Sequence, residues 1–137
     1  MNTTVCLCGS TRFLDAFQRA NIELSKHGFS VITISMCLPK NEQGAEDEAA
    51  LKELLDLVHL NKIMRADAVF VVGDGYIGRS TAREILWAEM QDKPVIAERD
   101  CTTWDEAAHR VRHAVVDTYI YPKAREALGL IKKAKAA

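Results

Sequence analysis

Residues 67–81 read Asp-Ala-Val-Phe-Val-Val-Gly-Asp-Gly-Tyr-Ile-Gly-Arg-Ser-Thr, and this stretch decides the fold. Residues 68–72 are all apolar and show no polar alternation, which predicts a strand that is covered on both faces of a sheet. The glycine-rich run at 73–78 predicts a loop, and the hydroxyl pair Ser80-Thr81 predicts the start of a helix. A covered strand that feeds a helix through a glycine turn is typical of α/β proteins with a parallel sheet.

Strands and helices also alternate on either side of this stretch. Short apolar runs predict further strands, and apolar residues at helical spacing predict helices between them: strands at Thr4–Cys8, Phe29–Ile34 and Pro94–Ala97, and helices at Phe13–Lys26, Glu48–Arg65 and from Ser80 to about Gln91. Such alternation implies right-handed crossovers, so we expect an open, doubly wound parallel sheet of four to five strands. Ligands bind such sheets where the strand order reverses, which here brings together the loops after the first and third strands.

Two segments remain outside this pattern. The polar stretch Pro39–Asp47 is long for a loop in a small domain, and we interpret it as a lid or binding loop. From Asp105 onward we expect two C-terminal helices separated near Pro122, because proline disfavours the helix interior.

The composition is that of an ordinary globular protein, with 48% hydrophobic and 27% charged residues. The length of 137 residues fits a single domain over residues 1–137. A net charge of −1, with both signs interspersed, argues against duplex nucleic acid as a partner. The sequence has neither an apolar run of membrane-spanning length nor a basic, signal-like start, so we expect a cytoplasmic protein without a membrane partner.

The four cysteines are Cys6, Cys8, Cys37 and Cys101. Cys6 and Cys8 lie two apart on an expected strand and point to the same face, which makes a disulfide between them difficult. The sequence shows neither a C-x-x-C pair nor a histidine at suitable spacing, so we expect reduced thiols and no metal site.

The first turn that can carry chemistry is Gly9-Ser10-Thr11-Arg12, between an expected strand and helix. The glycine allows close approach of a ligand, the helix start presents unpaired N–H groups, and Arg12 suits a phosphate or carboxylate. The alternative is that Ser10 or Thr11 only caps the helix and Arg12 is solvated, and the pattern alone does not decide.

The second turn, at 73–78, has the same design and leads into a helix that contains Glu84, which we expect in its first turn. A carboxylate there can act as a nucleophile or bind sugar hydroxyls. The alternative is structural, because Thr81-x-x-Glu84 matches the capping-box pattern.

His59 lies four residues after Leu55, on the flank of an apolar helical stripe. Most histidines in that position are satisfied groups at the edge of a core. An imidazole whose pKa lies near neutrality can nevertheless be protonated at physiological pH and then donate this proton to a leaving group.

Three blocks of the chain, Val5–Arg12, Lys62–Val72 and Gly78–Ala88, resemble the nucleoside 2-deoxyribosyltransferase superfamily. That superfamily includes the deoxynucleoside 5′-monophosphate N-glycosidases. The resemblance runs in the right order from about residue 4 to residue 97 and does not cover the tail. It implies a flavodoxin-like fold, assembly into a homo-oligomer, cleavage of the bond between base and deoxyribose, and no metal or organic cofactor.

The resemblance also implies roles for single residues. Glu84 holds the position of the family's nucleophile, which forms a covalent glycosyl-enzyme that another base or water resolves. His59 stands eight residues before Asp67, where the family commonly has an acidic proton donor. The 5′-phosphate site of the hydrolase branch falls on Gly9, Ser10, Arg12, Ser80 and Gly78.

Two other hypotheses stay open beside the enzyme. In the first, the same two glycine turns bind a nucleotide without catalysis, and the protein is a nucleotide sensor. In the second, the hydroxyl residues only cap the helices, and the protein is a dimerisation scaffold. For the enzyme or the sensor, the positive charges of Arg12, Arg79 and Arg83 suit an anionic small molecule, a nucleoside 5′-monophosphate among them. The base, the sugar and the choice between hydrolysis and transfer are not decided by the sequence.

Overall fold

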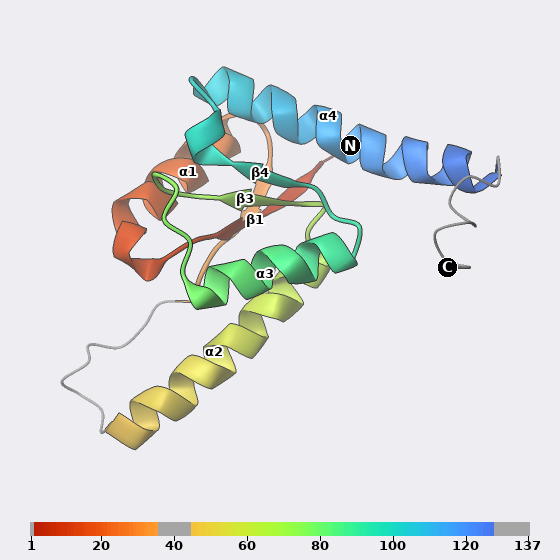
Figure 1. Ribbon diagram of the computed structural model, residues 1–137. Helices are drawn as coiled ribbons and strands as arrows, with labels where there is room; N and C mark the ends of the chain where they lie inside the picture. The colour runs from red at the N-terminus through yellow and green to blue at the C-terminus, as the bar shows by residue number, and fades with distance from the viewer. Residues whose placement is uncertain (1, 36–44, 128–137) are drawn as a thin grey trace.

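The computed structural model describes residues 2–35 and 45–127, and its centre is a parallel sheet of four strands (Figure 1). The strands are β1 (Thr4–Cys8), β2 (Ser30–Ile32), β3 (Ala68–Val71) and β4 (Val95–Ala97). Their order is β2-β1-β3-β4, and all three pairings are parallel. This is the strand order of flavodoxin-like folds. The expected α/β fold is therefore confirmed.

Helices cover both faces of the sheet (Figure 1). A 3-10 turn, η1 (Thr11–Phe13), leads into α1 (Leu14–Lys26); the other elements are α2 (Ala45–Arg65), α3 (Arg79–Met90), the 3-10 turn η3 (Glu98–Asp100) and α4 (Trp104–Ala127). The apolar sides of α1 and α4 pack on one face, and those of α2 and α3 pack on the other. The chain thus forms three layers.

The central strands β1 and β3 divide their side chains between these two cores. On β1, Val5 and Leu7 pack with the α1 and α4 side, whereas Cys6 and Cys8 face α2 and α3. All of these side chains are fully buried. Alternation of side chains along a strand therefore places both thiols on the face where α2 and α3 lie.

Two expectations about the helices need correction. α2 begins at Ala45, so the end of the expected loop Pro39–Asp47 is helical, and residues 36–44 lie outside the described residues, as does Cys37. The expected break near Pro122 is wrong, because α4 runs continuously from Trp104 to Ala127. A proline inside a helix costs about 3 kcal/mol, and the buried anchors Val111 and Val115 hold the preceding turns of α4 against the sheet.

The start of α4 is capped by Thr103, and the helix begins at Trp104, one residue before the start expected at Asp105. The Thr103 hydroxyl accepts a hydrogen bond from the Glu106 N–H at 3.1 Å, and the Glu106 carboxylate accepts one from the Thr102 N–H at 2.8 Å. The first of these bonds satisfies an N–H group that a helix start leaves unpaired. Within the described residues, no helix is both long enough and apolar enough to span a bilayer.

Candidate functional site

The loops after β1 and β3 meet at the carboxyl ends of the strands, as expected, because β1 and β3 are neighbours in the sheet. The Arg12 guanidinium lies 3.6 Å from the centre of the Tyr76 ring, and Phe13 meets the same ring edge-on. Gly9 has a φ of 151°, and a Cβ there would lie 2.8 Å from the Val72 side chain. The first turn is therefore fitted closely against the second, and Arg12 is stacked on an aromatic ring.

The hydroxyls of the first turn divide their roles. The Ser10 hydroxyl accepts a hydrogen bond from the Arg12 N–H at 3.3 Å and so caps η1. This is the capping role that the sequence left open for Ser10 or Thr11. Thr11 is exposed and follows the cap.

The start of α3 differs from the expectation. Gly78 is the N-cap in an extended conformation, without a side-chain cap, and its carbonyl accepts a hydrogen bond from the Ala82 N–H at 2.9 Å. Thr81 therefore lies inside the helix and is buried, so the capping-box interpretation of Thr81 and Glu84 is wrong. Glu84 is the sixth residue of α3 and lies in its second turn, not its first.

Glu84 and His59 face one another between the two helices that cover this side of the sheet. The distance from His59 Nε2 on α2 to Glu84 Oε1 on α3 is 3.7 Å. The residues are 6% and 9% exposed, respectively, so both are held away from bulk water. A carboxylate and an imidazole in such contact can exchange a proton or act on one substrate from adjacent positions.

Burial and charge shift the pKa values of both groups. Burial raises the pKa of Glu84 from 4.5 to about 7, although the positive charge of His59 opposes the rise. For His59, burial lowers the pKa, but the hydrogen bond and charge of Cys6 and the charge of Glu84 outweigh it, so the net shift is upward. A pair of neighbouring buried groups whose pKa values are both shifted is a common feature of functional sites.

Cys6 and Cys8 complete the surroundings of His59. Their Sγ atoms lie 3.7 and 3.4 Å from His59 Nε2, respectively. The hydrogen bond from Cys8 lowers the pKa of Cys6 to about 6 against the effect of burial, and His59 adds to the lowering. The same hydrogen bond, together with burial, raises the pKa of Cys8. The expectation that no histidine is suitably placed for these thiols is therefore wrong, because α2 folds His59 onto β1 from 51 residues away along the chain.

Ser80 has a partner that the sequence analysis missed. Its hydroxyl donates to Asp56 Oδ2 at 3.3 Å and accepts from Lys52 at 3.1 Å. Asp56 also pairs with Lys52 at 3.0 Å and with Arg83 at 3.2 Å. The (i, i+4) spacing of Lys52 and Asp56 was the available signal, but such pairs are frequent on helix surfaces and do not indicate a site.

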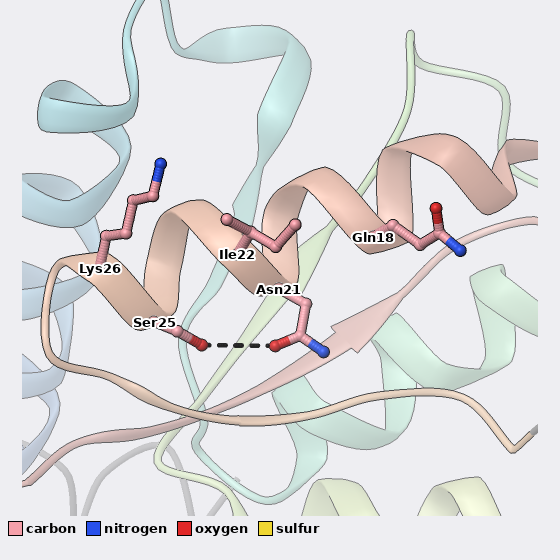
Figure 2. A pocket seen from close by; sticks show the side chains of 5 residues that line it. All are labelled: Gln18, Asn21, Ile22, Ser25 and Lys26. Atoms are coloured by element: carbon pink, nitrogen blue, oxygen red, sulfur yellow. Dashed lines mark hydrogen bonds between the residues drawn. The ribbon is translucent and has the colours of Figure 1, made fainter.

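A separate surface hollow lies along α1 (Figure 2). Figure 2 shows its lining, which comes from this one helix: Gln18, Asn21, Ile22, Ser25 and Lys26. The Ser25 hydroxyl donates to the Asn21 side-chain oxygen across it at 3.3 Å. None of these residues belongs to the loops after β1 and β3, so the hollow is not part of the candidate site.

No family model and no curated protein sequence matches the chain. Among solved structures, it is similar to the CMP N-glycosidase BcmB of Clostridium botulinum, with 18% sequence identity and a TM-score of 0.43. The match covers 79% of this chain and 81% of that one.

Proposed function

We propose that this protein cleaves the N-glycosidic bond of a nucleoside or a nucleoside 5′-monophosphate, with Glu84 as the nucleophile and His59 as the proton donor. The observation that carries the proposal is the 3.7 Å contact between His59 Nε2 and Glu84 Oε1, inside the layer next to the carboxyl end of β1. The resemblance of the three sequence blocks supplies the reaction class. The geometry supports the assignment of roles, because it sets a carboxylate and an imidazole side by side.

In the proposed reaction, a Glu84 carboxylate oxygen attacks the anomeric carbon of the sugar. The bond from this carbon to the base nitrogen breaks, its electron pair stays on the base, and protonated His59 gives the base a proton. The product of this step is a glycosyl ester on Glu84. Water or a second base then attacks the same carbon, releases the carboxylate and returns a proton to His59, as in retaining glycosidases.

The two turns at the strand ends provide the proposed clamp for the rest of the substrate. Gly9, Ser10, Thr11 and Arg12 form the first turn, and Arg12 presents a planar cation above Tyr76. Gly78 and Ser80 begin α3, whose N-terminal end carries a partial positive charge. A 5′-phosphate bound at Ser80 would replace Asp56 Oδ2 as the acceptor of the Ser80 hydroxyl and would accept a hydrogen bond from Lys52 Nζ, which donates to this hydroxyl.

We also propose that the protein assembles into a homo-oligomer through α2 and α3. Large apolar side chains on both helices are more than half exposed, namely Leu54, Leu57, Leu86 and Met90. The first half of α2 extends past the sheet (Figure 1). Large apolar side chains that stay exposed are a common feature of protein interfaces. Sedimentation velocity of the protein tests this: a monomer at micromolar concentration contradicts it.

The activity is tested by incubating the purified protein with a panel of purine and pyrimidine nucleosides and 5′-monophosphates, both ribo and deoxy. Chromatography measures the free base, with and without an acceptor base, which separates hydrolysis from transfer. We expect wild type to release base from at least one member of the panel. Mass spectrometry of the quenched reaction is expected to find the glycosyl group on Glu84.

Variants assign the roles. Glu84→Gln should lose base release and the covalent intermediate, and His59→Gln should slow base release by about 10²–10⁴-fold, the usual contribution of general acid catalysis. Glu89→Gln is the matched control, because Glu89 is exposed on the same helix. Base release at the wild-type rate by Glu84→Gln contradicts the proposal. Tight binding of a nucleotide by wild type without any base release favours the sensor instead.

A further inference from the structure

Two thiols and one imidazole meet in the buried layer between β1 and α2. Cys6 and Cys8 are completely buried, and His59 is 6% exposed. The two Sγ atoms and one ring nitrogen all lie within 4.8 Å of one another. Within the described residues, this is the cluster whose ligand atoms are close enough together to hold one metal ion.

The two nitrogen–sulfur separations are close to those that a tetrahedral zinc ion imposes on its ligands. With Zn–S bonds of about 2.3 Å and Zn–N bonds of about 2.0–2.1 Å, the sulfur and nitrogen ligands of a tetrahedron lie about 3.5 Å apart. The distances from His59 Nε2 to the thiols of Cys6 and Cys8 are 3.7 and 3.4 Å. The nitrogen–sulfur edges of such a site therefore agree with a tetrahedral ion to within a few tenths of an ångström.

The fold holds these groups firmly. The two cysteines are successive residues of one face of β1, a strand paired on both sides. His59 comes from α2, whose neighbouring Ile63 is completely buried against the same core, together with Val69. Ligands set on regular elements and surrounded by an apolar shell are the usual supports of a metal centre.

We propose that Cys6, Cys8 and His59 form a site for a thiophilic cation such as Zn²⁺. Thiolate and imidazole ligands select zinc or copper(I) over magnesium and calcium, which take oxygen ligands. Three protein ligands leave one coordination position of a tetrahedral ion for a fourth ligand. Glu84, with Oε1 at 3.7 Å from His59 Nε2, is the neighbouring side chain that can supply it or hold a water molecule there.

Metal binding at this site has a consequence for catalysis that rests on the proposed function. The ion takes Nε2, the same ring nitrogen that faces Glu84. A metal-bound nitrogen carries no proton, so His59 cannot protonate a departing base. The site then acts as an inhibitory metal switch on the glycosidase activity.

Metal binding is tested without any activity assay. In a Cys37→Ala/Cys101→Ala background, Cys6 and Cys8 are the remaining cysteines of the four. The reduced, chelator-treated protein is titrated with Co²⁺ and then with Zn²⁺. We expect a thiolate-to-cobalt charge-transfer band and the intense visible bands of tetrahedral Co²⁺, both of which Zn²⁺ removes and Mg²⁺ does not. X-ray absorption of the zinc form should count two sulfur ligands at about 2.3 Å.

Adding Cys8→Ala to this background should weaken zinc binding by more than about 100-fold, beyond the 10–100-fold cost of losing an outer-sphere partner. Cys6→Ala is the second variant if Cys8→Ala does not fold. The X-ray absorption measurement on the background protein depends on neither variant. A zinc form with only nitrogen and oxygen ligands, or no cobalt band, overturns the proposed site.

The inhibitory role is tested separately by measuring base release with added Zn²⁺. We expect inhibition in the background protein and at least about 100-fold lower sensitivity to zinc after Cys8→Ala. If zinc binds through both thiols while base release is unchanged or faster, the inhibitory switch is refuted, but the proposed metal site still stands. If the protein binds zinc but releases no base from any substrate, the proposed function is refuted, and the proposed metal site again still stands.

Discussion

Replacement of Glu84 by glutamine should make the protein more stable at alkaline pH. The Glu84 side chain is buried between α2 and α3, and burial raises its pKa from 4.5 to about 7. Its ionised form is therefore less favourable in the folded protein than in the unfolded chain. Glutamine keeps the shape of this side chain and removes the charge.

The expected size follows from the pKa shift. At about 1.4 kcal/mol per pKa unit, the rise from 4.5 to about 7 corresponds to about 3 kcal/mol. Between these two pH values the folded protein holds the proton more tightly than the unfolded chain, so the free energy of unfolding falls as the pH rises. Above about pH 7 the whole loss is present. Burying an amide with incomplete hydrogen bonding costs about 1 kcal/mol, which leaves a net gain of about 2 kcal/mol for the variant.

Urea denaturation in the presence of a chelator measures this gain. We expect the Glu84→Gln variant to exceed wild type by about 2 kcal/mol near pH 8 and to lose the advantage near pH 5, where the wild-type carboxyl is already neutral. The exposed Glu89→Gln control should follow wild type at both values. A variant that is less stable than wild type near pH 8, or a difference that does not change with pH, refutes the reasoning about this buried carboxylate.

Two further predictions concern the supports of the fold. Gly9→Ala should lower the free energy of unfolding by about 2–4 kcal/mol, because its φ of 151° suits glycine and the added Cβ lies 2.8 Å from the nearest side-chain atom. Gly28→Ala, at a φ of 92° with nothing within 4 Å, should cost less, about 1–2 kcal/mol; equal costs in thermal denaturation contradict the packing argument. The pKa of His27 is raised first by its hydrogen bond with the Glu23 carbonyl and then by Asp105, whose Oδ1 lies 2.8 Å from His27 Nε2. Asp105→Asn should therefore lower this pKa in an NMR titration, although the Glu23 contribution remains. The raised pKa stabilises the fold below pH 6.5 and this stabilisation fades as the pH rises through the folded value, so the variant should lose stability only on the acid side.

Most of the architecture was predictable from the sequence, because the patterns that indicate strands and helices are local. The unbroken apolar run at 68–72 requires two covered faces, and this places β3 in the middle of a parallel sheet. The start of α3 was misplaced because Thr81-x-x-Glu84 satisfies the capping-box pattern, whereas the extended Gly78 begins the helix earlier. The continuity of α4 through Pro122 was missed because a proline inside a helix is costly, and the sequence carries no local sign that the helix continues past it.

The candidate site was predictable only in part, because its members are joined by tertiary packing. The face shared by Cys6 and Cys8 follows from the two-residue period of a strand, and it was available from the sequence. The face of α2 that carries His59 was also available, but the register of α2 against β1 was not, and that register decides whether the imidazole meets the thiols. A shift of α2 by one residue along β1 would rotate His59 by about 100° and separate it from both the thiols and Glu84. The proposed proton donor and the proposed metal site therefore depend on one packing geometry, so a variant that disturbs it should lose both together.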